Sequence, residues 1–160
     1  MEVKNIFFSY WKSILVTIGI LYLSFSPPST FESVPRISQF PHSDKVIHFA
    51  MFFVLTAVLI YERANERKRE TSTKNKNILE NKNSRLRAFA PSSIRPFVLL
   101  CFVFPIALGG IIEILQEMFF KPRSAEWLDW AADIAGVLAA WAVFLIARKA
   151  RMGERTKSNI

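Results

Sequence analysis

Long apolar runs, separated by blocks of charged residues, constrain the fold of this chain more than any other feature of its sequence. The runs cover about residues 6–26, 46–61, 97–120 and 127–147. A helix needs about 20 predominantly apolar residues to cross the hydrocarbon core of a bilayer. Backbone groups inside lipid must be satisfied within the protein, which a helix does by itself. We therefore predict an all-α integral membrane protein whose residues 1–150 form a four-helix bundle.

Two of the four runs reach spanning length only if polar residues at one end are counted inside them. The second run is short unless Asp44 and Lys45 also enter the membrane, so its helix is predicted over about residues 44–61. The fourth run, about residues 127–147, reaches spanning length only with Asp129 and Asp133 included. Ionisable side chains at bilayer depth cost free energy, so they are candidates for a functional site.

Proline and glycine residues affect how the first and third runs are interpreted. Pro105 and the pair Gly109-Gly110 predict a kink or a locally open backbone within the third helix. The first run has the length and flanking charge of a signal peptide. Pro27 directly follows the candidate cleavage site, however, so we expect an uncleaved helix over about residues 6–26.

The distribution of basic residues predicts the orientation of the helices. Ten of the 21 Lys and Arg residues lie in the connection of residues 62–96, and five follow Ala147. Cytoplasmic loops of membrane proteins carry the excess of Lys and Arg. We therefore expect both termini, the basic tail of residues 151–160 and the loop of residues 62–96 to be cytoplasmic. The low apolar content of this loop predicts that it is largely disordered.

The composition excludes some other functions. The formal net charge of +8 would in isolation suggest binding to nucleic acid. Apolar runs of this length, however, require a lipid environment. We therefore expect the lipid bilayer as partner and no nucleic acid. The single cysteine, Cys101, cannot form an internal disulfide. The number of protomers does not follow from the sequence.

The predicted orientation places the polar ends of three helices at the outer face, at one depth. In each helix the polar residues are three or four positions apart (Asp44 and His48, Glu113 and Gln116, Asp129 and Asp133), so each pair lies on one face of its helix. The Asp residues at the helix starts also have a purely structural explanation, because the helix dipole favours an Asp in the first turn. The candidate ligand-binding residues are Asp44, His48, Glu113, Gln116, Arg123, Asp129 and Asp133.

The chemistry of this set allows catalysis, binding or bracing of the helices. The candidates for a catalytic group are His48, Glu113 and Asp133, as general acid, general base or both. Trp127 and Trp130 flank the set, either as interfacial anchors or as rings that stack on a sugar or headgroup. The spacing of the acidic residues and His48 is not diagnostic of a metal, so the sequence predicts neither a metal nor another cofactor.

Several of these residues occur in an ordered combination of motifs. They are the string Asp44-Lys45-Val-Ile-His48-Phe49, the pair Glu113-x-x-Gln116, the basic turn ending in Arg123, and Trp127-Leu-Asp129-Trp-Ala-Ala-Asp133-Ile-Ala-Gly136. The combination, over roughly residues 44–144 with the basic loop as an insertion, resembles the VanZ-like family of small bacterial membrane proteins. The chain departs from that pattern at Asp133, where the family more often has Asn, so the resemblance does not support a strict amide role there.

The resemblance implies a multi-pass protein of the bacterial cytoplasmic (inner) membrane. The founding member of the family is associated with antibiotic resistance, to the lipoglycopeptide teicoplanin, without an established mechanism. Our first hypothesis is an outward-facing polar pocket that binds or remodels an outer-leaflet amphiphile, either a cell-wall lipid precursor or a lipoglycopeptide. The alternatives are a membrane-embedded hydrolase or transferase acting on a lipid-linked phosphate or ester, and a structural or partner-binding membrane protein. The sequence leaves these three open.

Overall fold

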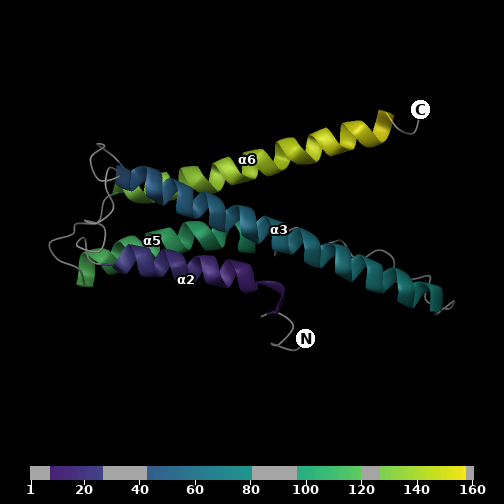
Figure 1. The fold of residues 1–160 in the computed structure, drawn as a ribbon, viewed down its shortest axis with the longest axis horizontal. Helices are drawn as coiled ribbons and strands as arrows, with labels where there is room; N and C mark the ends of the chain where they lie inside the picture. The colour runs from purple at the N-terminus through teal and green to yellow at the C-terminus, as the bar shows by residue number, and fades with distance from the viewer. Residues whose placement is uncertain (1–7, 27–42, 81–96, 120–126, 158–160) are drawn as a thin grey trace.

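A computed structural model describes residues 8–26, 43–80, 97–119 and 127–157 of the chain (Figure 1). Over these ranges every regular element is a helix, which confirms the predicted all-α class. The elements are α2 (Trp11–Phe25), α3 (Ser43–Glu80), the π-helix η2 (Leu99–Val103), α5 (Phe104–Phe119), which continues η2 without a break, and α6 (Trp127–Lys157).

Three of these helical stretches are long and apolar enough to cross a membrane. They are Asp44–Arg69, Leu99–Phe119 and Trp127–Arg151. Helix α2 is also apolar but has 15 residues, which is short for a crossing. Many large apolar side chains of all four helices point outward and are exposed, and Phe119 and Ile146 are each 69% exposed. So large an apolar surface is unfavourable in water, so a lipid bilayer is the environment that fits this multi-pass protein.

Helix α3 lies at the centre of the arrangement. In Figure 1 it runs between α6 on one side and α2 and α5 on the other, and its most extensive packing is against α6. The buried core forms where these helices meet, with Phe52, Leu55, Ile112 and Val137 at 0–1% exposure. The first turns of α3 and α6 and the last turns of α2 and α5 all lie at one end of the molecule (Figure 1).

Gly136 sets the closest approach of α3 and α6. A Cβ atom at this position would lie 2.3 Å from the carbonyl oxygen of Phe49 and 3.0 Å from the backbone nitrogen of Phe53. The first distance is far shorter than a van der Waals contact and the second is shorter than an ordinary one, so any side chain larger than hydrogen would force the two backbones apart. Beyond this crossing α3 and α6 diverge toward their C-terminal ends (Figure 1).

The helix irregularity lies just before Pro105, in the π-helical turn Leu99–Val103, whereas Gly109 and Gly110 lie in regular α-helix. Proline has no backbone N–H, so Pro105 cannot donate to the carbonyl oxygen of Cys101 four residues earlier. The indole nitrogen of Trp141 on α6 donates to that oxygen instead, at 3.0 Å. A π-helical turn of this kind is one of the recognised causes of an irregular helix.

Two helices are longer than the sequence indicated. The prediction that the second helix ends near Tyr61 and is followed by a largely disordered loop is wrong for residues 62–80, which continue α3. Residues 81–96 of that loop lie outside the described residues. Helix α6 similarly continues beyond residue 147 to Lys157. Both extensions are rich in Arg and Lys and contain Glu, residues that favour helix intrinsically even where no apolar pattern is present.

Candidate functional site

Polar residues from three helices meet at the end of the molecule that holds the first turns of α3 and α6. All of them except Asp44 and Lys45 are buried, with exposures between 1% and 7%. Their proximity agrees with the prediction that the polar helix ends lie at one depth. We define the polar cluster as Asp44, Lys45, His48, Glu113, Asp129 and Asp133.

The central contact of the polar cluster joins α3 to α6. The Nδ1 atom of His48 lies 3.0 Å from Oδ1 of Asp133, and both side chains are buried. His48 directly precedes Phe49, and Asp133 lies one helical turn before Gly136, so the close helix crossing holds the two groups at this distance. Removing one partner of such a buried ion pair or hydrogen bond is costly, because the other partner is left buried and unpaired.

Gly109 on α5 leaves space for the second oxygen of Asp133. A Cβ atom at Gly109 would lie 2.6 Å from Oδ2 of Asp133. Among the described residues this buried oxygen has no hydrogen-bond partner. Buried polar atoms are normally paired, so an orphaned carboxylate oxygen indicates a position where a donor or a cation is accepted.

Two overlapping groups in the polar cluster have the chemistry and spacing of metal ligands. His48, Glu113 and Asp133 each offer a ligand atom within 4.8 Å of the others, and all three are buried. Asp44, His48 and Asp129 form the second group under the same limit, with Asp44 exposed. Asp129 also accepts a 3.2 Å hydrogen bond from Lys45, which balances part of its charge. The spacing of these residues along the sequence did not indicate either group.

Gln116 follows Glu113 by one turn on α5, and its side chain contacts the end of α2. Its Nε2 atom donates to the backbone carbonyl of Ser24 at 2.7 Å. That carbonyl belongs to the last turn of α2, where helical carbonyls have no partner of their own. Gln116 therefore holds the end of α2 against α5, and its predicted contact with a ligand stays a prediction.

The two tryptophans predicted to flank the site differ in their burial and contacts. Trp130 is partly buried, and its indole nitrogen donates to the carbonyl of Ile106 at 3.1 Å. Trp127 is 79% exposed, with its ring centroid 5.9 Å from that of Trp130. The two tryptophans thus present one buried anchor and one exposed ring. Arg123 lies outside the described residues.

Sequence reasoning missed a second buried polar group, at the start of α2. The carboxylate of Glu62 accepts a hydrogen bond from the Ser13 hydroxyl and from the backbone N–H groups of Lys12 (3.0 Å) and Ser13 (3.3 Å). One turn further along α3, Glu66 accepts from the Tyr10 hydroxyl. These contacts satisfy first-turn donors of α2 and join α2 to α3. The four-residue spacing of Glu62 and Glu66 after an apolar run was the signal available in the sequence.

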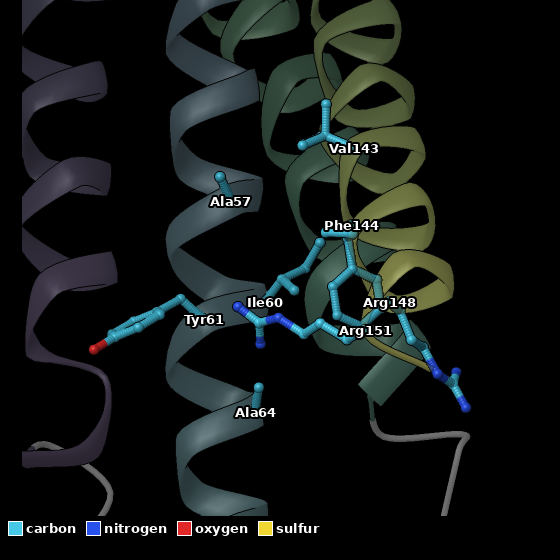
Figure 2. Close-up of a pocket in the computed structure, with 10 residues that line it drawn as sticks. Ala57, Ile60, Tyr61, Ala64, Val143, Phe144, Arg148 and Arg151 are labelled. Carbon is cyan, nitrogen blue, oxygen red and sulfur yellow. The ribbon is translucent and has the colours of Figure 1, made fainter. Parts of the chain in front are cut away.

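An apolar groove lies between α3 and α6 where the two helices diverge, away from the polar cluster (Figure 2). Its volume is about 480 Å³. Small and aliphatic side chains such as Ala57, Ile60 and Val143 form its walls, and the side chain of Arg151 extends across it toward α3 (Figure 2).

Comparison with known proteins adds no relative. No protein-family model, curated protein or solved structure matches the chain. The resemblance to the VanZ-like family therefore depends on the motifs in the sequence, and the function must be argued from the polar cluster itself.

Proposed function

We propose that the polar cluster binds the headgroup of an outer-leaflet amphiphile, a cell-wall lipid precursor or a lipoglycopeptide, in a VanZ-like protein of the bacterial cytoplasmic membrane. The observation that carries the proposal is the buried Oδ2 atom of Asp133, which has no hydrogen-bond partner among the described residues. A cluster that served only to brace the helices would gain most by pairing every buried oxygen. An oxygen left available, in space kept open by Gly109, suits the hydroxyl or amide donors of a sugar-peptide headgroup.

The surroundings of the polar cluster fit a ligand that is partly apolar. The exposed Trp127 ring offers a surface on which a sugar can stack or an acyl chain can pack. Asp44 is exposed and shares the first two turns of α3 with His48, so it lies on a route from the surface to the buried residues. In this proposal Arg123 meets a phosphate or carboxylate of the ligand.

The test is ligand-induced stabilisation of the detergent-purified protein. A lipid-linked cell-wall precursor or teicoplanin should raise the melting temperature, whereas a phospholipid of equal chain length should not. Asp133→Leu, which removes both acceptor oxygens, should remove the shift. Glu117→Gln is the matched control, because Glu117 is an exposed carboxylate on α5, one turn from Glu113. Equal shifts with the precursor, teicoplanin and the phospholipid would overturn the proposal.

A measurement in cells separates a working site from a bracing network. Glu113→Gln keeps the shape of the side chain and removes its charge. Normal accumulation of this variant in membranes, with loss of a teicoplanin-resistance effect that the unaltered protein confers, supports the site. Poor accumulation instead supports a role for Glu113 in helix packing, the structural alternative.

The contact of His48 with Asp133 favours a second candidate function, catalysis on a lipid-linked phosphate or ester. A histidine held by a buried carboxylate at 3.0 Å is a common arrangement for a general acid or base. Product release from a fluorescent lipid substrate, lost in His48→Ala, would support this activity. Absence of turnover across a panel of phosphate and ester lipids would exclude it.

The proposed orientation places both termini in the cytoplasm and the polar cluster at the outer face. It is supported by the basic extensions of α3 and α6, which lie at the ends of these helices remote from the polar cluster. Reporter fusions at the C-terminus test it: green fluorescent protein should fluoresce and alkaline phosphatase should be inactive. The reverse pattern would place the polar cluster on the cytoplasmic side.

A further inference from the structure

The three buried residues of the polar cluster that come from separate helices have the composition of a metal site. His48 from α3, Glu113 from α5 and Asp133 from α6 are 6%, 7% and 1% exposed. Their ligand atoms all lie within 4.8 Å of one another. Atoms bound to one ion at about 2.0–2.2 Å are at most about 4.4 Å apart, so small side-chain movements bring all three into one coordination sphere. We propose that His48, Glu113 and Asp133 bind a divalent transition-metal ion.

The distance between His48 and Asp133 fits this proposal. Their Nδ1 and Oδ1 atoms are 3.0 Å apart. Two neighbouring ligands at about 2.1 Å from an ion are about 3.0 Å apart in octahedral and about 3.4 Å apart in tetrahedral geometry. The observed contact therefore leaves room for both atoms on one ion, without separation of α3 from α6.

The charge of the polar cluster gives a reason for a cation. Among the described residues it contains the four carboxylates of Asp44, Glu113, Asp129 and Asp133, against the basic groups of Lys45 and His48. Lys45 is already paired with Asp129. Burial removes the hydration of a carboxylate, and this loss is costly unless a positive charge compensates it. A divalent ion would place two positive charges beside the buried carboxylates of Glu113 and Asp133.

The orphaned oxygen of Asp133 is a second, independent observation. Its Oδ2 atom is buried and has no hydrogen-bond partner among the described residues, and Gly109 leaves the space beside it open. A metal ion can use this lone pair directly, or through a bound water. The second group, Asp44, His48 and Asp129, shares His48 and includes an exposed carboxylate, so it provides an entry path for the ion.

The ligand set selects the class of metal. An imidazole with two carboxylates suits zinc and manganese, whereas calcium and magnesium prefer oxygen ligands throughout. With three protein ligands a coordination position stays open for water or for an oxygen of a ligand. Binding of the ion itself does not depend on the proposed amphiphile, so the two proposals can fail separately.

The experiment uses the full chain purified in detergent, stripped with EDTA and dialysed. After addition of Zn²⁺ or Mn²⁺ and removal of the excess, elemental analysis should find one ion per chain, and the melting temperature should rise above that of the stripped protein. Ca²⁺ and Mg²⁺ should give neither result. Asp133→Asn and Glu113→Gln should each weaken binding at least about tenfold, because an anionic ligand is replaced by a neutral amide. Glu117→Gln should bind as the unaltered protein does.

The outcomes decide the proposal even if a variant does not fold. Substoichiometric zinc and manganese on the folded, unaltered protein would overturn it. So would unchanged binding in a folded Asp133→Asn or Glu113→Gln variant, since the ion would then lie elsewhere. Stabilisation by Ca²⁺ or Mg²⁺ alone would contradict the part assigned to His48.

Discussion

Replacing Gly136 with alanine is expected to destabilise the protein by forcing α3 and α6 apart. The new Cβ would lie 2.3 Å from the carbonyl oxygen of Phe49 and 3.0 Å from the nitrogen of Phe53, whereas ordinary contacts begin at 3.4 Å. Both neighbours are backbone atoms, which cannot rotate out of the way. The helices must therefore separate locally by about 1 Å, and overpacking of this kind costs about 1–3 kcal/mol.

Two further terms modify this estimate. Alanine is favoured over glycine inside a helix by about 1 kcal/mol, which offsets part of the strain. A separation of about 1 Å at the crossing also stretches the contact of His48 with Asp133 from 3.0 Å to about 4 Å, beyond hydrogen-bonding distance. Loss of a buried, charge-assisted hydrogen bond costs about 1.5–3 kcal/mol. The net destabilisation expected for Gly136→Ala is therefore about 2–4 kcal/mol.

Thermal unfolding in detergent, followed by tryptophan fluorescence and size-exclusion chromatography, measures this effect. Gly19→Ala is the matched control, because Gly19 is also in a helix but nothing lies within 4 Å of its added Cβ. It should be neutral or slightly stabilising. If Gly136→Ala and Gly19→Ala unfold at the same temperature, α3 and α6 do not approach each other backbone to backbone, and the argument for how the His48 contact is held is refuted.

Three other substitutions test separate contacts by the same unfolding measurement. Glu62→Ala removes the acceptor of a hydroxyl and two backbone N–H groups of α2, so stability should fall by about 2 kcal/mol; an unchanged melting temperature would show that α2 is not held there. Gln116→Met removes the hydrogen bond to the end of α2 and should cost about 1 kcal/mol, and a gain in stability would contradict that role. Lys45→Gln should cost less than about 1 kcal/mol, because the pair with Asp129 is partly exposed, and the difference should shrink as salt is added; a salt-independent loss would contradict an ionic contact.

The sequence predicted the helical fold and the place of the polar cluster because both depend on simple regularities. Apolar run length indicated where the helices are, and three- and four-residue spacing indicated which polar residues share a face. Once the helices alternate in direction, the polar ends of α3, α5 and α6 must meet at one end of the molecule. The arrangement of His48, Glu113 and Asp133 agrees with that reasoning.

The partners within the polar cluster could not be predicted in the same way. Whether Gln116 faces the cluster or the end of α2 depends on the rotation of α5 about its axis, which the sequence pattern does not fix. The pairing of His48 with Asp133 rather than Asp129 depends on the crossing at Gly136. The role of Glu62 was missed because a charged segment after an apolar run looks like a solvated loop unless its buried partner, here the start of α2, is known.

Asp133 and Arg151 lie on opposite sides of the crossing at Gly136 and at very different distances from it. At about 1.5 Å of rise per residue, Asp133 lies about 4.5 Å from the crossing and Arg151 about 22 Å from it on the other side. A rotation of the helices by about 5° about this point moves Asp133 by about 0.4 Å and Arg151 by about 2 Å. A given change in the angle between α3 and α6 therefore alters the width of the groove of Figure 2 far more than the geometry at His48.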